Sequence, residues 1–511
     1  WTGDKLGPRT LHMATTSRST RRRSSAASAC APEALKSNAM SLLYDFEEHI
    51  LGEIMYHLPL PAVTRLAGVS KRWRQVIVGE DSDQHLWKTL MERDFGRTAS
   101  ASPFATKAPP PADGSGQCAR GQYVDLWKVE QCVKPRWTQR VGANLATTVG
   151  ARQGSAATVF DGKMVVFAGW TSGWQAIRND VHMLHVDRVE REEDEAGSST
   201  EAPEYKLTWE SLHCVGELPP ASYGPCIVTC LSRKHGKCMV AHGGVTYGSY
   251  QGPISEMRIL TPMASGECAE AGAAEASSPQ PKKKTPWCWH EPCATSSLAD
   301  SEPGTPRAYH SMAYLPTPSG EAGGKIFVFG GFAHGQPLAD LECVELVPGE
   351  TDADEGWHWS SVVTQGTPPC PRFGNSMTLV GRRLFVLGGC TGGHNHKGNG
   401  TDGQELRDVH VLSGLDDDVP VWSTPALTSF PGARCLQRCH STVVVGTSLL
   451  IFGGGPSFGL SNALTRLDTR TMAFEDVEPE GELPQERQNA CFVALGGGSE
   501  IVMYGGWRGN E

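Results

Sequence analysis

The stretch Ile326-Phe-Val-Phe-Gly-Gly331 and its near copy Leu384-Phe-Val-Leu-Gly-Gly389 decide the fold of this chain. A short apolar run that ends in a glycine pair also occurs at Met164–Gly169, Met239–Gly244, Leu450–Gly454 and Ile501–Gly506, although Ala168 replaces the first glycine of the earliest copy. The last residues of successive copies are 75, 87, 58, 65 and 52 positions apart. A period near 50 residues, lengthened by insertions, indicates a repeat architecture with one small sheet per copy.

Each diglycine run is accompanied by three further strand patterns. An apolar run precedes it, an alternating run follows it, and a strand centred on an aromatic residue ends the unit. These aromatic residues are Trp209, Trp289, Trp359, Trp422 and Phe474. Four strands per unit are typical of a propeller blade, and the aromatic adds buried area where neighbouring blades meet.

These four-strand units resemble kelch repeats, and the resemblance covers residues 133–511. We therefore predict a mainly β fold, a six-bladed kelch β-propeller with an incomplete sixth blade. Five units carry all four strands and the sixth carries two before Glu511. Pro135-Arg136-Trp137-Thr138 is a tryptophan strand with no blade before it, and we expect it to close the ring as the outer strand of blade six. The third strand of that blade has no candidate, which favours truncation of the sequence at its C-terminus.

Residues 41–97 have helical rather than strand periodicity. Ile50, Leu51, Ile54, Met55 and Leu58 recur on one helix face, and Pro59-Leu60-Pro61 ends that helix. A unit of about 50 residues with such short helices is marginal alone, so we expect it to dock on the chain or on a partner.

The run Val69-Ser-Lys-Arg-Trp73 with a downstream Leu86-Trp87 resembles the F-box, a small all-α domain. The family's leading Leu-Pro is absent, because Tyr44 follows Leu43. The resemblance implies binding to the Skp-type linker of a cullin-RING ubiquitin ligase. The order of domains is also similar to the C-terminal part of plant blue-light clock receptors, but without their flavin-binding LOV domain. The linker-binding residues that the resemblance implies are Leu43, Ile50, Leu51, Ile54, Leu58, Pro59, Val63, Leu66 and Trp73.

Two segments have compositions that do not support a core. Residues 1–40 are predicted to be a disordered basic tail, although a transit peptide has the same Arg- and Ser-rich composition. Residues 98–132 are predicted to be a linker that begins Ala-, Ser- and Pro-rich and ends in a closing helix at Tyr123–Gln131.

A protein substrate is expected on the face that carries the loops between second and third strands and the connections between blades. Aromatic residues and Arg on loops are common interface anchors. The predicted substrate-binding residues are Trp170, Trp174, Tyr247, Tyr250, Phe332, His334, His394, His396, Phe458, Trp507 and Arg508. An Arg also recurs where each blade begins, at Arg152, Arg307, Arg372, Arg438 and Arg487. These arginines suit an acidic peptide or a structural role, and the repetition favours the structural role.

The sequence favours a non-catalytic substrate adaptor of an SCF-type ligase, with the Skp-type linker, a cullin and a target protein as partners. No nucleotide-binding, hydrolase or zinc-protease motif occurs, and we predict no cofactor and no metal site. The net charge of -10 gives no basic footprint for nucleic acid or an acidic membrane. The 16 scattered cysteines suggest reduced thiols in the cytoplasm or nucleus. A kelch scaffold without ubiquitination, and a metal-dependent kelch enzyme using His394 and His396, remain alternatives.

Overall fold

The computed structural model describes the chain mainly as a set of β-sheets. It describes residues 77, 86–87, 90, 135–138, 149–171, 176–189, 204–246, 252–263, 286–296, 304–349, 351, 355–392, 403–429, 435–455, 459–498 and 500–509. The chain divides into two compact units, Trp1–Ile77 and Val78–Glu511. Ile77, Leu86, Trp87 and Leu90 are helical and buried. The predicted linker-binding residues lie outside the described residues, as do the tail and the Tyr123–Gln131 segment. Within the described ranges, no helix is long and apolar enough to cross a membrane.

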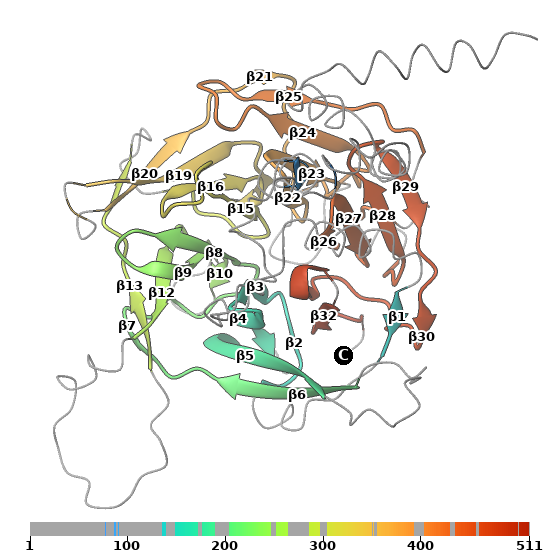
Figure 1. Cartoon of the computed structure of the whole chain (residues 1–511), viewed down its shortest axis with the longest axis horizontal. Helices are drawn as coiled ribbons and strands as arrows, with labels where there is room; N and C mark the ends of the chain where they lie inside the picture. The colour runs from blue at the N-terminus through green and yellow to red at the C-terminus, as the bar shows by residue number, and fades with distance from the viewer. Residues whose placement is uncertain are drawn as a thin grey trace, which may run out of the picture. The chain divides into compact units, whose positions relative to one another are not determined.

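Blades one to five each contain the four predicted strands, arranged around a common centre (Figure 1). Blade one comprises β3 (Ala156–Phe160), β4 (Lys163–Thr171), β5 (Ile177–Val189) and β6 (Glu204–Ser211). Blade two comprises β8 (Cys226–Ser232), β9 (Gly236–His242), β12 (Met257–Pro262) and β13 (Trp287–His290). Blade three comprises β15 (Ser311–Leu315), β16 (Gly324–Phe329), β19 (Leu341–Val347) and β20 (Gly356–Ser361).

Blades four and five follow the same order, and blade six is shorter. Blade four comprises β22 (Ser376–Val380), β23 (Arg383–Leu387), β24 (Val409–Ser413) and β25 (Val421–Ser423). Blade five comprises β26 (Ser441–Val445), β27 (Ser448–Phe452), β28 (Leu464–Asp468) and β29 (Ala473–Asp476). Blade six has β31 (Cys491–Leu495), the 3-10 turn η5 (Gly496–Gly498) and β32 (Glu500–Tyr504), and among the described residues β31 and β32 form a two-stranded sheet.

A short parallel strand that the sequence did not reveal links consecutive blades. After the aromatic strand of one blade, the chain pairs in parallel with the aromatic strand of the next. These link strands are β7 (Cys214–Gly216) on β13, β14 (Ala294–Ser296) on β20 and β21 (Gln365–Gly366) on β25. The link strand β30 (Glu480–Gly481) pairs in the same way with β1 (Arg136–Trp137). β1 therefore occupies the place of the aromatic strand of blade six, as predicted from Trp137.

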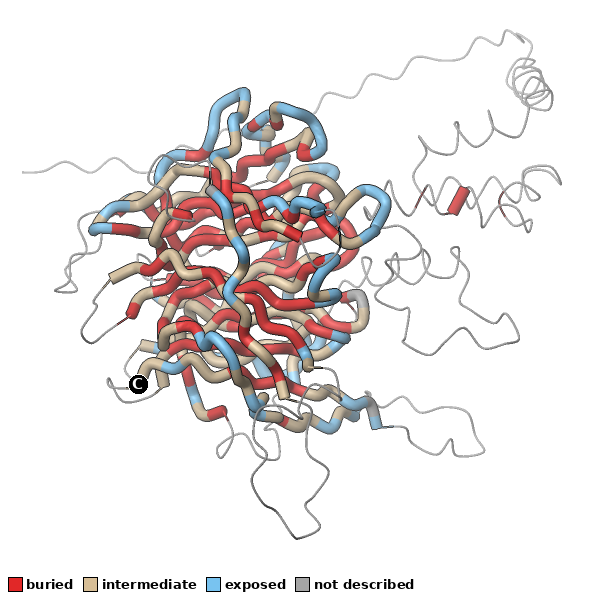
Figure 2. The backbone as a smooth tube through the Cα atoms, turned by 90° about the vertical axis from the view of Figure 1, so that its left-hand side faces the viewer, coloured by how far each residue is buried: buried red, intermediate tan, exposed pale blue. Residues whose placement is uncertain are grey.

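Apolar clusters fill all six contacts between neighbouring blades. The strands of each blade carry buried residues, and Figure 2 shows these buried residues concentrated along the strands of the propeller. One cluster joins blade six to blade one through Val493, Leu495, Val166 and Trp209. Another joins blade five to blade six, where Trp137 lies 5.7 Å from Phe452 and 6.5 Å from Phe492. The ring is thus continuous around the centre.

The diglycine positions explain why the repeat requires glycine. The first glycine of each pair has a positive φ, for example 66° at Gly330 and 68° at Gly505. Residues with a side chain rarely adopt this backbone conformation. A Cβ on Gly330 would lie 2.8 Å from the carbonyl oxygen of Arg372 in the next blade. At Gly505 the same contact is made with the carbonyl of Arg152, across the junction between blades six and one. Ala168, the exception predicted from the sequence, has a φ of 61°.

Candidate partner-binding site at the channel mouth

The loops between second and third strands share one face with the connections between blades. Two of these loops fold as hairpins, β10 (Val245–Thr246) with β11 (Gly252–Pro253), and β17 (Phe332–Ala333) with β18 (Gln336–Pro337). In blade one, β2 (Arg152–Gln153) pairs with the end of β4. Single bridges join Tyr223 to Val245, Ala308 to Phe332, and Gln488 to Trp507. The loop face is therefore built from the two kinds of connection that were expected there.

Three of the five repeated arginines brace the blades from inside and do not line the face, whereas Arg438 and Arg487 are partly exposed. Arg307 and Arg372 have no exposed side-chain surface, and Arg152 has 1%. Arg372 donates to both carboxylate oxygens of Asp408 at 2.7 and 2.9 Å, and to the carbonyl oxygen of Gly388 at 3.0 Å. Arg152 likewise donates to both carboxylate oxygens of Asp180, whereas Arg307 donates to Asp340 from Nη2 alone and also pairs with the buried Glu342 at 2.7 Å. These charge-assisted pairs hold the second and third strands against the start of their blade.

Two of these braces extend into a Ser/Thr–His–Asp chain. His182 Nδ1 lies 3.0 Å from Ser211 Oγ, and its Nε2 lies 2.9 Å from Asp180. Blade four repeats the chain with Thr424, His410 and Asp408, at 3.2 and 2.9 Å. Burial would raise the pKa of each Asp, but hydrogen bonds from the His and the Arg hold it well below its ordinary value. Because the chain recurs at equivalent strand positions, it is a structural brace of the repeat.

Just before the first strand of each blade, the chain forms a belt of left-handed residues around the channel, and in four blades the belt residue stands two positions after the Arg. We use channel-mouth belt for its six members, which have φ between 52° and 68°: Gly154, Gly224, Tyr309, Gly374, Cys439 and Asn489. The N–H of each later member donates to the carbonyl oxygen of the member before it, at 2.7 to 2.9 Å. Three members are glycine, for which a positive φ is easy. Tyr309, Cys439 and Asn489 keep the same φ with a side chain, a strain that clusters at functional positions.

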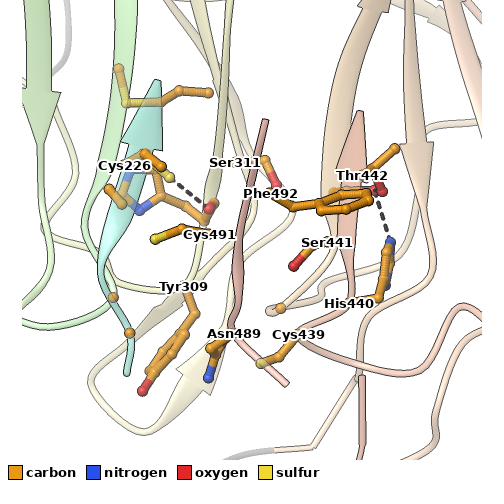
Figure 3. Close-up of a pocket in the computed structure, with 18 of the residues that line it drawn as sticks. Cys226, Tyr309, Ser311, Cys439, His440, Ser441, Thr442, Asn489, Cys491 and Phe492 are labelled. Carbon is orange, nitrogen blue, oxygen red and sulfur yellow. Dashed lines mark hydrogen bonds between the residues drawn. The ribbon is translucent and has the colours of Figure 1, made fainter. Parts of the chain in front are cut away.

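A cavity of about 260 Å³ opens along the first strands of all six blades. Figure 3 shows Tyr309, Cys439 and Asn489 at one end of this cavity. Its wall carries hydroxyls and thiols, including Ser311, Ser441, Thr442, Cys226 and Cys491.

The ionisable groups on this wall are held in their neutral forms. Burial raises the pKa of Cys226, Cys439 and Cys491 to about 12, and lowers that of His440 to about 4. The cavity wall is therefore polar but uncharged at neutral pH. Among the residues that the structure describes, no group of three or more His, Cys, Asp or Glu is placed to hold a metal ion.

Aromatic side chains connect the loop face to the belt. Trp170 packs edge-on against Tyr223 at 5.6 Å, and Tyr223 packs against Tyr309 at 5.8 Å. Phe332 packs against Phe373 at 5.8 Å, and the Arg438 guanidinium lies 5.9 Å from the same Phe373 ring. Tyr223, Tyr309 and Phe332 are each half-buried, so each offers part of its ring to a ligand.

The predicted substrate-binding residues fall into three groups. Trp170 and Phe332 belong to the aromatic contacts beside the channel. His334 and Arg508 are exposed, Arg508 donating to Gln485 at 2.5 Å, and Trp507 pairs through its backbone with Gln488. Trp174, Tyr247, Tyr250, His394, His396 and Phe458 lie outside the described residues.

The sequence prediction missed Tyr223, Tyr309, Cys439 and Asn489. All the predicted substrate-binding residues lie in the loops that follow the second strands, whereas these four residues precede the first strands. An alignment of the repeats on their arginines would have revealed Tyr309 and Asn489, because they stand where two other blades have Gly154 and Gly374. It would not have revealed Cys439, which directly follows Arg438, or Tyr223, whose blade has no such Arg.

Comparisons with known proteins identify the repeat. The sequence profile of the KLHDC2/KLHL20/DRC7 Kelch-repeats domain matches residues 287–506. The chain therefore contains a kelch-repeat domain, folded as the propeller described above.

Individual kelch proteins match over parts of their length. The "Rab9 effector protein with kelch motifs" of Rattus norvegicus is 27% identical over 40% of this chain and 50% of its own length. "Host cell factor" of Drosophila melanogaster is 25% identical over 36% of this chain and 12% of its own length. "Acyl-CoA-binding domain-containing protein 5" of Arabidopsis thaliana is 33% identical over 28% of this chain and 20% of its own length. This chain thus spans half of the rat protein and smaller parts of the other two.

Proposed function

We propose that this protein is a substrate-recruiting adaptor whose propeller binds a target protein at the channel mouth. The observation that carries the proposal is the channel-mouth belt, where three side chains interrupt a ring of strained backbone beside half-buried aromatic rings. Large, rigid aromatic rings that are partly exposed around a recess are typical anchors of protein interfaces. The neutral wall of the cavity suits an uncharged or apolar side chain of the target.

The helical segment supplies the second half of the proposal. The F-box-like residues 41–97 would bind the Skp-type linker, and the linker would bring a cullin and its ubiquitin-transfer machinery to the target. The support is the motif Val69–Trp73 with Leu86-Trp87, together with the helical, buried state of Leu86 and Trp87. The chain would then take part in ubiquitination without catalysing it.

Co-elution with the recombinant linker and the N-terminal part of a cullin tests the adaptor role. The intact chain is expected to co-elute with both in size-exclusion chromatography, and Leu58→Asp is expected to abolish this. Leu218→Asp is the matched control, because Leu218 is 50% exposed on the propeller. Failure of the intact chain to co-elute, or retention by Leu58→Asp, would contradict the adaptor role.

A scaffold without ubiquitination is the second candidate. It is favoured by the similarity to a protein described as a "Rab9 effector protein with kelch motifs", a description that names a protein partner. Under this reading, partner binding by the propeller persists while the chain recovers neither linker nor cullin.

A further inference from the structure

The hydrogen bonds along the channel-mouth belt leave one of the six junctions between blades open. Five junctions are closed by bonds of 2.7 to 2.9 Å from the N–H of one member to the carbonyl oxygen of the member before it. At the sixth junction, between blades six and one, no hydrogen bond joins Gly154 to Asn489, both of which the structure describes. Neither the Gly154 N–H nor the Asn489 carbonyl has another partner among the described residues.

A second ring of hydrogen bonds lies next to the belt along the cavity wall. Two positions after the belt member, a thiol or hydroxyl of one blade donates to a carbonyl oxygen of the next blade, as Cys226 does to His310 at 2.9 Å (Figure 3). The equivalent bonds are Ser311 to Asn375 at 2.8 Å, Ser441 to Ala490 at 2.7 Å and Cys491 to Ser155 at 3.5 Å. In blade four, Ser376 bonds at 2.8 Å to the ring of His440 in place of its carbonyl.

Blade one interrupts this second ring. It carries Ala156 at the donor position, and a methyl group cannot donate. The equivalent carbonyl of blade two belongs to Pro225, which is buried and accepts no hydrogen bond from a described residue. Ala156 itself lies in the apolar cluster between blades one and two. Because buried backbone carbonyls are nearly always paired, the Pro225 carbonyl indicates a donor that comes from outside the described residues.

The unpaired groups on the two sides of blade one define the chemistry of a ligand. Gly154, Asn489 and Pro225 line the same cavity, and they offer it one N–H donor and two carbonyl acceptors. A side-chain carboxamide is complementary, because it has one carbonyl oxygen and two N–H donors. A hydroxyl or a peptide group has only one donor, a carboxylate has none, and an ammonium or guanidinium has no acceptor.

The wall and the mouth of the cavity also suit a neutral side chain at this place. The thiols of the wall and His440 are uncharged at neutral pH. A charged side chain would therefore lose its hydration without gaining an opposite charge, which costs more than burial of a hydrogen-bonded neutral group. Gly154 and Gly224 are neighbouring members of the belt, so the belt itself places no side chain over this part of the wall.

We propose that the cavity binds the side-chain carboxamide of an Asn or Gln of the target protein. The inference rests on the proposed function, because it places this side chain in the recognition site at the channel mouth. The carboxamide oxygen would accept from the Gly154 N–H, and the two N–H groups would donate to the carbonyls of Asn489 and Pro225. The bound side chain would thereby complete both rings of hydrogen bonds beside blade one.

Selection of phage-displayed random peptides on the full 511-residue chain, with Tyr309→Gly as the counter-selection, is the first test. The peptides that require Tyr309 are expected to share an Asn or Gln. Its replacement by Glu or Met in a synthetic peptide is expected to weaken binding at least about tenfold. Tyr309-dependent peptides without a shared Asn or Gln, or equal binding of the Glu or Met peptide, would overturn the carboxamide and leave the proposed function standing. Absence of any Tyr309-dependent peptide would overturn the recognition role of the belt, and this inference with it.

Ala156→Ser tests the site from the side of the protein. The new hydroxyl would donate to the Pro225 carbonyl, as Ser311 does to Asn375, and is expected to weaken binding of the selected peptide at least about tenfold without lowering the melting temperature. The control Ala157→Ser adds the same hydroxyl in the cluster between blades six and one and is expected to keep the affinity. Unchanged affinity in a folded Ala156→Ser chain would overturn the proposal. If Ala156→Ser does not fold, the comparison of the Gln or Asn peptide with its Glu and Met forms decides.

Discussion

Each blade of this propeller begins with two repeated positions, two residues apart, that behave in opposite ways. The first is an Arg in four blades, and in three of these its guanidinium is buried against an Asp. The second is the member of the channel-mouth belt, which sits at the end of the cavity. The three buried arginines serve packing, whereas the belt position is glycine in three blades and Tyr309, Cys439 or Asn489 in the others.

The contrast teaches that a residue repeated from blade to blade indicates a structural role, whereas a side chain at a position that is otherwise glycine indicates a functional one. A repeated Arg could bind an acidic ligand because of its charge, but in this structure Arg152, Arg307 and Arg372 are buried and brace the blades. The belt needs a left-handed backbone in every blade, so glycine is its simplest member. Keeping Tyr309 at a φ of 52° costs stability, and we infer that this cost is retained because the ring contacts a partner.

Removal of a brace should give the largest effect on stability. Arg372→Ala removes both hydrogen bonds of the guanidinium to Asp408, leaves that carboxylate with His410, and opens a cavity. We expect a loss of about 3 kcal/mol in the free energy of unfolding. Chemical denaturation would measure it. The control Arg382→Ala removes a more exposed ion pair with Asp416 and should cost less than about 1 kcal/mol. Equal costs would show that Arg372 is no brace.

A methyl group on a belt glycine should give an intermediate loss in the free energy of unfolding. Gly374→Ala would place a Cβ 2.9 Å from Cys439 Sγ and 3.0 Å from its backbone nitrogen, at a φ of 63°. We expect a loss of about 2 kcal/mol, from left-handed strain plus the clash. Gly162→Ala, with a φ of 72° and open space around the Cβ, isolates the strain and should cost about 1 kcal/mol. A Gly374 variant no worse than the Gly162 variant would contradict a tightly packed belt.

Acid should weaken the braces before it affects the belt. The pKa values of Asp180 and Asp408 are depressed in the folded protein, so these groups stabilise the fold fully above their unfolded value, near 4. Their contribution is lost progressively as the pH falls below that value. Melting temperatures between pH 6 and pH 2 should therefore fall less steeply in Arg372→Ala, where the Arg no longer depresses the pKa of Asp408. An unchanged slope would argue against the brace.

The smallest effect on stability is expected at Tyr309. Tyr309→Gly relieves a strain of about 1 kcal/mol and loses an edge contact with Tyr223 of similar size. We expect the melting temperature to stay within about 2 °C of that of the original chain. A larger fall in the melting temperature would show that Tyr309, like the buried arginines, is required for stability.

The parts of the fold that repeat were predictable, and those set by the ring as a whole were not. Six diglycine runs and their aromatic partners predicted the blades, and Trp137 predicted the strand that joins the two ends of the propeller. The link strands β7, β14 and β21 have two or three residues and no distinctive composition, because they are stabilised by the neighbouring blade.

The candidate site was predicted less completely for a related physical reason. Loop aromatics such as Trp170 and Phe332 stand out in a sequence, whereas a positive φ at Tyr309 or Cys439 is imposed by the closed ring. The intrinsic conformational preferences of Tyr and Cys do not indicate this positive φ. Only the alignment of one blade with another shows that these side chains stand at a glycine position.

Recovery of partners by Tyr309→Gly tests the central claim most directly. The original chain, Tyr309→Gly and the control Ala168→Gly, which relieves strain away from the belt, would be compared by quantitative affinity purification from the same extract. We predict that Tyr309→Gly loses target proteins while keeping its melting temperature and the Skp-type linker, and that Ala168→Gly loses nothing. Full recovery of the same proteins by a folded Tyr309→Gly chain would contradict the assignment of the belt as the recognition site.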